Sequence, residues 1–420
     1  MVSVPRSPLG RIIERHALAR VDEALTDTRV VLINGARQSG KSTMAAHIAR
    51  QRDAASFSLD RSVTLDAAHR DPTAFVRAAN PMVIDEVQRA PELFLAIKEV
   101  VDSGFEPGRF LLTGSARILG LRGLPDTLLG RMETVELWPL SQGEIDDTPD
   151  GFVDAAFRDG PDLAHHSNET RSGYVHRLVR GGFPEAVART GRRRARFHEA
   201  YIADLVNRDV MQLSAIEHGP ELRRLITLLA GRSGQVIQTT NIANDVGLPR
   251  QTVERYLSLL EEVFLIKRLP YWSHGATARA TRAPKLAFVD SGIAATILGY
   301  DETSLADVTT PRGGILEGFV AMEIARQATW ARHSVDLFHY RTRDGVEVDI
   351  VLQDRRQRII GIEVKAAATV RGADFRGLRH LQQRLGHDFV AGYVLYLGEQ
   401  TLPFGDGLRA IPISALWQPA

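Results

Sequence analysis

The sequence predicts an α/β fold in three parts: a P-loop NTPase-type parallel sheet, a helical middle with a winged helix–turn–helix, and a second α/β domain. Between residues 29 and 140, short apolar runs such as VVLIN and FLLTG alternate with helical stretches. This rhythm is typical of a parallel sheet covered by helices on both faces. Residues 174–270 are mostly helical, and strands such as VEVDIVLQ return after residue 285.

Composition narrows the class of protein. A chain of 420 residues predicts two to three domains, at about 150 residues each. With 44% hydrophobic and 25% charged residues it has the composition of a globular protein. The 52 basic and 51 acidic residues nearly cancel, so any nucleic-acid contact must be a local patch. The absence of cysteine excludes disulfides, thiolate metal sites and a cysteine nucleophile.

Nothing in the sequence predicts a membrane protein. No apolar run approaches the ~18–20 residues of a membrane span, and the amino terminus lacks an apolar signal core. We therefore expect a cytoplasmic protein without a membrane partner. Only five of the 52 basic residues are lysines, at positions 41, 98, 267, 285 and 365. A lysine kept against such a bias indicates a place where an ammonium is needed.

The patterns divide the chain into four segments. Residues 1–145 form the P-loop domain, with a helix over the first ~26 residues where apolar side chains have helical spacing. Residues 146–173 are acidic and rich in Gly, Pro, Asp and Ser, and we expect a loop or linker. Residues 174–275 form a helical lid and the winged helix–turn–helix, and residues 285–420 form the second α/β domain.

The strongest motif is a phosphate-binding loop between a strand and a helix. Residues 35–42 read GARQSGKS, which fits G-x-x-x-x-G-K-[ST]. The backbone amides of such a loop face phosphate oxygens, Lys41 contacts the β- and γ-phosphates, and Ser42 binds Mg²⁺. ATP and Mg²⁺ are the predicted cofactors, and the predicted nucleotide-binding residues are Gly35, Ala36, Arg37, Gln38, Ser39, Gly40, Lys41, Ser42, Thr43 and Asp85.

Two further buried strands end in polar residues. The strand PMVI ends in Asp85 and Glu86, which predicts a carboxylate for Mg²⁺ followed by one that polarises the attacking water. The strand RFLL ends in Thr113 and Ser115. Either hydroxyl is a candidate for holding the γ-phosphate or the water, with Ser115 preferred, and either can instead be a turn residue.

Several segments together resemble a known family. They are LINGARQSGKS, VIDEVQRAPELF, LLTGSAR, LLGRMETVELWPLSQGE and GGFPEAV. Across the whole chain, they resemble prokaryotic AAA-type ATPases whose carboxy-terminal region is a domain of unknown function. The resemblance implies an AAA+-like domain and active sites completed between subunits, hence a homo-oligomer such as a hexameric ring. Arg131 is then the preferred arginine finger, with Arg117 and Arg122 as rivals, although each is equally interpretable as a solvated arginine.

The segment TNIANDVGLPRQTVERYLSLLE has the spacing and turn of a helix–turn–helix. As a DNA reader, its second helix would present Arg250, Gln251 and Arg255, and Lys267 and Arg268 follow where a wing is expected. Glutamates at positions 254, 261 and 262 would repel phosphates, so a packing or oligomerisation module is the alternative. An upstream arginine cluster is a candidate backbone contact or a solvated helix face; it comprises Arg189, Arg192, Arg193, Arg194 and Arg196.

The carboxy-terminal strands carry acidic residues and a lysine. Asp349 lies within VEVDIVLQ, and Glu363 and Lys365 share one face of RIIGIEVKA. This segment resembles the PD-(D/E)XK, restriction-endonuclease-like fold, although Val348 stands where a proline often precedes the aspartate. The resemblance implies Mg²⁺ bound by Asp349, Glu363 and a helical acid, with Lys365 activating water. The helical acid is Glu317 or, second, Glu323; the alternative is a structural Asp–Lys ion pair.

Three functional hypotheses follow from these motifs. The first is an oligomeric AAA+-type ATPase that binds or remodels duplex or branched DNA, with a Mg²⁺-dependent nuclease activity as an option. The second is a nucleotide-controlled protein-interaction module without nuclease activity. The third is a metal-dependent nuclease in which ATP is only regulatory.

Overall fold

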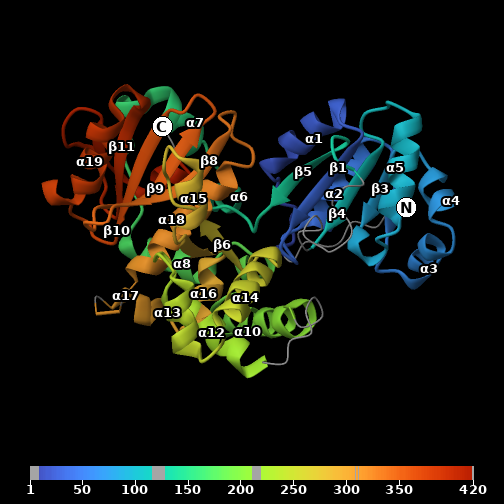
Figure 1. The fold of residues 1–420 in the computed structure, drawn as a ribbon, viewed down its shortest axis with the longest axis horizontal. Coiled ribbons are helices and arrows are strands. Elements are labelled where there is room, and N and C mark those ends of the chain that lie inside the picture. Colours follow the sequence, from blue (N-terminus) through green and yellow to red (C-terminus); the bar gives the residue numbers. More distant parts are fainter. Residues whose placement is uncertain (1–8, 116–127, 211–218, 308, 311, 419–420) are drawn as a thin grey trace. The chain divides into compact units, whose positions relative to one another are not determined.

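The computed structural model describes residues 9–115, 128–210, 219–307, 309–310 and 312–418 (Figure 1). These residues form two compact units. Unit 1 comprises Met1–Leu140, Phe183–Ala188 and Glu262–Phe264, and unit 2 comprises the remainder. The chain therefore returns to unit 1 twice, so the middle region expected as a separate domain is shared between the two units. Phe264, for example, packs edge-on against Trp138 of unit 1 with ring centroids 5.4 Å apart.

Unit 1 contains the predicted parallel sheet. Its order is β2-β3-β4-β1-β5, and each neighbouring pair is parallel. The strands are β1 (Val30–Gly35), β2 (Ala55–Ser58), β3 (Met82–Asp85), β4 (Phe110–Gly114) and β5 (Met132–Leu137). All six residues of β1 are buried, as expected for a strand between two others with helices on both faces. Because the strands are parallel, their carboxyl ends meet at one edge of the sheet.

Helices pack on this sheet. Helix α1 contacts β1 and β5, while α2 contacts β3 and β4. The helices of unit 1 are α1 (Ala17–Asp27), α2 (Lys41–Gln51), α3 (Ser62–Arg70), α4 (Pro72–Arg77), the 3₁₀ turn η1 (Val87–Arg89), α5 (Leu93–Ser103) and α9 (Pro184–Val187). The amino-terminal helix begins at Ala17, so the expectation of a helix from the start of the chain is wrong for residues 9–16. Arg15 in that stretch is instead bonded to two carbonyl groups of the sheet's carboxyl edge.

Unit 2 contains a six-stranded mixed sheet and a two-stranded one. The larger sheet has the order β12-β13-β11-β10-β9-β8, in which β10, β11 and β13 are parallel. Strands β6 and β7 pair antiparallel. The strands are β6 (Ile266–Leu269), β7 (Lys285–Phe288), β8 (Val335–Arg341), β9 (Glu347–Asp354), β10 (Ile359–Lys365), β11 (Phe389–Tyr396), β12 (Leu402–Pro403) and β13 (Leu408–Pro412).

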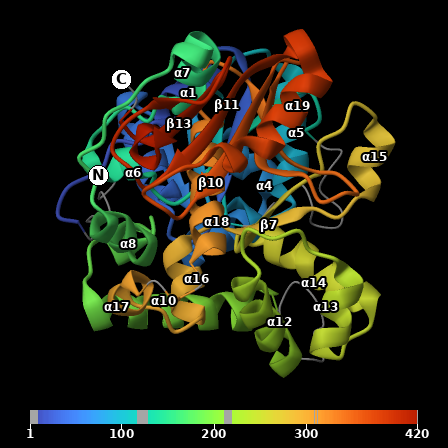
Figure 2. The same cartoon turned by 90° about the vertical axis from the view of Figure 1, so that its left-hand side faces the viewer.

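Two groups of helices can be distinguished in unit 2 by their position relative to the larger sheet. Helices α10, α12, α13, α14 and α16 lie together away from the larger sheet, whereas α19 lies beside β10 and β11 (Figures 1 and 2). The α-helices are α6 (Gln142–Asp146), α7 (Phe152–Asp159), α8 (Arg171–Arg180), α10 (Gly191–Asp204), α12 (Gly219–Gly231), α13 (Thr239–Val246), α14 (Arg250–Glu262), α15 (Ala276–Thr281), α16 (Ser291–Ile297), α17 (Glu302–Ala306), α18 (Gly313–Gln327) and α19 (Arg376–Leu385). Shorter turns are η3 (Gly160–Asp162), η4 (Leu205–Val210), η5 (Gly372–Phe375), η6 (Gly386–Asp388) and η7 (Ile413–Leu416).

The acidic segment at residues 146–173 is not simply a loop or linker. It contains α7, whose apolar residues are buried; these are Phe152, Val153, Ala155, Ala156 and Phe157. The acidic composition concealed this helix because the aspartates lie on its less buried side. The Tyr393 hydroxyl of β11 donates a 2.6 Å hydrogen bond to the Gly160 carbonyl just after α7. This segment is therefore part of the packed structure of unit 2.

Two helices joined by a tight turn occupy the segment for which the sequence predicts a helix–turn–helix. Helix α13 ends before Gly247, whose φ is 72°, and α14 begins three residues later. The inward residues of α14 are Val253, Tyr256, Leu257, Leu259 and Leu260. Strand β6, expected as a wing, pairs with β7 rather than with an adjacent hairpin strand. Within the described ranges, no helix has the length and apolarity needed to cross a bilayer.

Candidate nucleotide site and carboxy-terminal charge cluster

The phosphate-binding loop connects β1 to α2 at the carboxyl edge of the unit 1 sheet. Gly35 is required because a Cβ there would lie 2.0 Å from the Leu137 carbonyl oxygen, and Gly40 has a φ of 100°. Helix α2 begins directly after the loop and has no side-chain cap among the described residues. Its first amide groups are therefore available to an anion.

Two cations hold the loop from within. Lys41 is buried, and its Nζ donates to the carbonyl oxygens of Gly35 at 3.0 Å and Ala36 at 2.8 Å. Arg15 is also buried and donates to the carbonyls of Ser39 and Trp138, both at 2.7 Å. The sequence did not single out Arg15, because it lies outside the motif in an arginine-rich chain.

Ser42 and Asp85 meet as the motif predicts. Ser42 Oγ donates to Asp85 Oδ1 at 2.9 Å, and Thr113 Oγ1 donates to the same oxygen at 2.5 Å. Ser58 Oγ lies 3.4 Å from the other carboxylate oxygen. A carboxylate beside a serine hydroxyl provides the oxygen ligands that Mg²⁺ uses at phosphate sites. The residues present therefore fit the predicted metal.

Glu86 follows in a conformation that is unusual for a residue other than glycine. Its φ and ψ are 59° and 46°, and its amide donates to Thr113 Oγ1 at 3.0 Å. Its carboxylate accepts hydrogen bonds from Gln88 Nε2 and from Ser115 Oγ, the latter at 3.3 Å. Of the two predicted sensor hydroxyls, Thr113 therefore contacts Asp85 and Ser115 contacts Glu86. Such strained residues cluster at functional sites.

Unused hydrogen-bonding capacity remains at this edge of the sheet. Asn34 Oδ1, Ser39 Oγ and Gln88 Oε1 are buried without a hydrogen-bond partner within the described part of the chain. Asn34 precedes the phosphate-binding loop, Ser39 lies in it, and Gln88 follows β3. Buried polar atoms without partners are costly. Their concentration here indicates a site that accepts a polar ligand.

Arg131 lies at the opposite edge of the sheet. Its carbonyl accepts from the amide of Val30 at the start of β1, whereas the phosphate-binding loop follows the end of that strand. Six residues of strand separate the two by roughly 20 Å. Arg131 also forms a bidentate pair with Asp102, lowering the pKa of that carboxyl below its usual value. It cannot serve the site of its own subunit; Arg117 and Arg122 lie outside the described residues.

The predicted nucleic-acid residues are partly paired. Arg250 Nε lies 2.9 Å from Glu254, and Arg268 Nε lies 2.7 Å from Glu261. Arg255 lies over the Tyr256 ring and Lys267 is half-buried. In the upstream arginine cluster, Arg194 is buried, Arg189 lies over the Phe197 ring, and Arg192, Arg193 and Arg196 are exposed.

A lysine that sequence reasoning left unassigned lies at the centre of the carboxy-terminal cluster. Lys285 Nζ, from β7, lies 2.6 Å from Asp349 Oδ1 and 2.9 Å from Glu317 Oε2. The other Asp349 oxygen accepts from the Val364 amide at 2.9 Å. Lys365 Nζ lies 2.9 Å from Glu363 Oε1. The predicted acids thus come together, but around an ammonium group.

Burial and repulsion between neighbouring carboxylates raise the pKa values of two of these acids. Burial, reinforced by the Asp349 charge, raises the pKa of Glu363 to about 8 and that of Glu317 to about 7. Burial opposes the charge of Lys285, yet Asp349 and Glu317 together raise its pKa above its ordinary value. The ammonium is therefore firmly charged and compensates the carboxylates.

The expected magnesium ligand set of Glu317, Asp349 and Glu363 stays a prediction. Within the ranges the structure describes, no group of three or more His, Cys, Asp or Glu residues is placed to hold a metal ion. Lys285 bonds two of the three acids, and its charge compensates theirs. This arrangement favours the alternative interpretation, an ion-pair network. In the sequence, Lys285 could have been noticed because lysine is rare in this chain.

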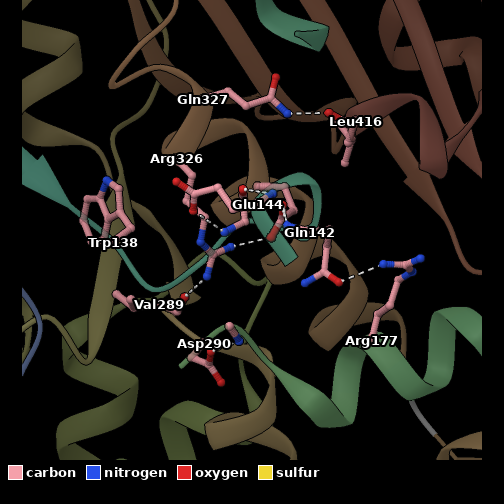
Figure 3. Close-up of polar contacts among 12 residues, drawn as sticks. Trp138, Gln142, Glu144, Arg177, Val289, Asp290, Arg326, Gln327 and Leu416 are labelled. Carbon is pink, nitrogen blue, oxygen red and sulfur yellow. Dashed lines mark hydrogen bonds and ion pairs between the residues drawn. The ribbon is translucent and has the colours of Figure 1, made fainter. Parts of the chain in front are cut away.

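Glu323, the second choice for the helical acid, belongs to a different cluster. It is fully buried, pairs with Arg326 at 2.6 Å and accepts from the Gln142 amide at 2.9 Å. Arg326 also donates to the Val289 carbonyl at 2.9 Å (Figure 3). Asp150 nearby accepts hydrogen bonds from Ser141 Oγ and from the Gly143 amide. These contacts fasten the first segment of unit 2 to helix α18.

Three segments match known domain families. Residues 27–146 match an AAA domain, residues 171–304 match a domain of unknown function (DUF8612), and residues 312–416 match another (DUF4143). The first match covers β1, the phosphate-binding loop, Asp85 and Glu86. The AAA-domain match and the geometry of the site together support ATP binding and hydrolysis.

Full-length similarity extends to two curated relatives. Uncharacterised proteins of Mycobacterium tuberculosis and Mycobacterium bovis are each 28% identical to this chain over 417 residues. The alignments cover 98% of this chain and 86% of each relative. The sequence similarity therefore extends over nearly the whole of this chain.

Solved structures show weaker similarity. The Walker-type ATPase of Pyrococcus abyssi is 14% identical with a TM-score of 0.46, and the alignment covers 70% of this chain and 98% of that one. The Thermotoga maritima RuvB Holliday junction branch migration motor is 17% identical with a TM-score of 0.31, covering 64% and 93%. With TM-scores this low, neither similarity assigns a property to this chain.

Proposed function

We propose that this protein binds ATP with Mg²⁺ and hydrolyses it to ADP and phosphate. The observation that carries the proposal is the hydrogen-bonded chain Ser42–Asp85–Thr113–Glu86 beside a phosphate-binding loop. It joins residues from α2, β3, β4 and the turn after β3 at one edge of the sheet. No structural requirement of the sheet explains two adjacent acids and two hydroxyls at that point.

The residues then take distinct roles. The loop amides and Lys41 bind the phosphates, and Ser42 and Asp85 hold Mg²⁺, which neutralises charge on the phosphate oxygens. Glu86 accepts a proton from the attacking water as the water oxygen bonds to the γ-phosphorus and the bond to ADP breaks. Ser115 orients the Glu86 carboxylate through its hydroxyl.

A Lys41→Ala variant tests the binding part of the proposal. Removing the ammonium should weaken ATP binding at least ~10-fold, because Lys41 is the residue of the motif that contacts the β- and γ-phosphates. Titration with a fluorescent ATP analogue measures this. Arg343→Ala, at an exposed position in unit 2, is the control and should bind normally. Unchanged affinity in Lys41→Ala would contradict the site.

We also propose a nucleic-acid partner for the helix–turn–helix. Three polar side chains on the exposed face of α14 favour it: Arg250, Gln251 and Arg255. The pair between Arg250 and Glu254 is exposed and so contributes about 0–1 kcal/mol, which phosphate contacts can offset. The alternative is a protein partner on the same face.

Salt dependence and ATPase stimulation discriminate the two partners. Duplex DNA binding should weaken by roughly 0.9 log units per phosphate contact for each log unit of salt. Replacing Arg250 and Arg255 with Ala should reduce both affinity and slope, whereas Arg343→Ala should change neither. If neither duplex nor branched DNA binds at low salt or stimulates hydrolysis, the protein-partner alternative stands.

We propose a homo-oligomer, such as a hexameric ring, in which Arg131 is the arginine finger. Arg131 lies at the edge of the sheet away from its own phosphate-binding loop, so any contact that it makes with a nucleotide would be with that of another subunit.

A further inference from the structure

We propose that Gln88 is a positioning residue for the hydrolysis of ATP. Its amide nitrogen holds the Glu86 carboxylate beside Ser115, and its carbonyl oxygen accepts a hydrogen bond from the attacking water. This inference rests on the proposed function and extends it to a residue outside the motifs that predicted the site.

The geometry is a triangle of three side chains. Gln88 Nε2 donates to Glu86 and also to Ser115 Oγ at 2.9 Å. Ser115 Oγ in turn lies 3.3 Å from the same oxygen of Glu86, Oε2. Glu86 and Gln88 follow β3, and Ser115 follows β4, so the triangle joins the ends of two neighbouring strands. Gln88 is the member that donates to both of the others, through its amide nitrogen.

The orientation of the Gln88 amide follows from its neighbour. An ionised carboxylate only accepts hydrogen bonds, so the NH₂ group must face Glu86 and the carbonyl oxygen must face away from it. That oxygen, Oε1, is buried and has no hydrogen-bond partner among the described residues. A water molecule beside Glu86 would satisfy it. A glutamine that orients the attacking water is a known device in nucleotide hydrolysis.

The neighbours of Gln88 in the turn η1 point elsewhere. Val87 is completely buried in the apolar core of unit 1, and Arg89 pairs with the exposed Asp60 at 2.6 Å. The left-handed backbone of Glu86 begins this turn, and its amide is fixed by Thr113. Val87 therefore packs in the core and Arg89 lies at the surface, whereas the side chain of Gln88 lies beside Glu86.

Three variants of the full chain test the inference. Gln88→Ala should lower kcat ~10–100-fold and leave the affinity for a fluorescent ATP analogue within about 2-fold, since Gln88 contacts Glu86 and not the loop. Gln88→Glu keeps a side chain of the same length but replaces the amide that donates to Glu86 with a carboxylate that repels it, so this variant should also lower kcat and leave the affinity for ATP within about 2-fold. Arg89→Ala removes a neighbouring surface ion pair and should leave both kcat and the affinity for ATP unchanged.

The outcomes separate this inference from the proposed function. An active wild type with an unaffected Gln88→Ala variant would overturn the role of Gln88 and leave the ATPase proposal intact. Equal losses of kcat and ATP affinity in Gln88→Ala, or a wild-type kcat in Gln88→Glu, would also overturn it. A wild-type chain that binds ATP without turnover under any condition would overturn both. Thermal unfolding of each variant should be measured alongside, to check that the variant is folded.

Discussion

At the scale of single residues, this chain uses buried cations in specific places. Lys41 and Arg15 hold the phosphate-binding loop, and Lys285 holds the carboxy-terminal acids. The sequence motif predicted Lys41 because the loop is local and its spacing is fixed. Lys285 and Arg15 act on residues far along the chain, Lys285 on an acid 64 positions away. Such pairings are set by how strands and helices meet, which no local pattern records.

Lys285→Met should destabilise the protein by about 3–5 kcal/mol, because it leaves buried carboxylates without their cation. Chemical denaturation measures this, with Arg158→Ala at an exposed ion pair as the control expected to be nearly as stable as wild type.

The same variant tests the ion-pair interpretation of these acids against the predicted metal site. With the ammonium removed, Mn²⁺ or Mg²⁺ should recover part of the lost stability by binding the freed acids. Wild type should gain less from the metal, and the phosphate-binding loop is common to both proteins. Greater stabilisation of wild type than of Lys285→Met would contradict the ion-pair interpretation.

At the scale of elements, the first segment of unit 2 is fixed by a capping box and a buried acid. Ser141 caps α6 with reciprocal help from Glu144, and Asp150 accepts from Ser141 and from the Gly143 amide. The sequence predicted a loop here because glycine, proline and aspartate are frequent. Those residues form the turns around α6 and α7, and the apolar residues of α7 are too few to stand out by periodicity.

Burial, followed by the charge of Glu323, raises the pKa of Asp150 to about 8. A carboxyl whose folded pKa exceeds its unfolded value of about 4 stabilises the fold fully below that value. This contribution is lost as the pH rises through about 8. Wild type should therefore lose stability between pH 5 and pH 8 by an amount on the order of 2–5 kcal/mol from this group.

Asp150→Asn should flatten that dependence, since an amide is neutral throughout and asparagine tolerates the positive φ of 50° at this position. Denaturant unfolding at each pH measures the slope. Asp344→Asn, at an exposed position, is the control and should keep the wild-type slope. An unchanged slope in Asp150→Asn would show that Asp150 is ionised in the folded protein.

At the scale of the whole molecule, the parallel sheet, the phosphate-binding loop and the acids after β3 were predictable. Each depends on residues adjacent in sequence at a strand end. The division into two units was not, because short pieces such as Phe183–Ala188 return to unit 1 through tertiary contacts. Gln88 was missed for a related reason: its role depends on Ser115, which lies 27 residues away and follows a different strand.

The proposed homo-oligomer is tested by removing the Arg131–Asp102 ion pair in two ways, with a substitution of either partner. Arg131→Ala and Asp102→Ala both abolish the Arg131–Asp102 pair. If Arg131 acts on the nucleotide of another subunit, only Arg131→Ala should lose turnover, by ~10³-fold or more. Turnover per subunit of wild type should also rise with protein concentration. Equal losses of turnover in the two variants would show that Arg131 acts only through its ion pair with Asp102, which is a structural role.

The central claim, that unit 1 hydrolyses ATP through Glu86, is tested most directly by phosphate release. Wild type and Glu86→Gln should be compared at saturating ATP and Mg²⁺, with nucleotide affinity measured in parallel. We expect Glu86→Gln to bind ATP within a few-fold of wild type and to release phosphate at least ~100-fold more slowly, because the amide cannot accept the proton from water. Hydrolysis at the wild-type rate by Glu86→Gln would contradict the account.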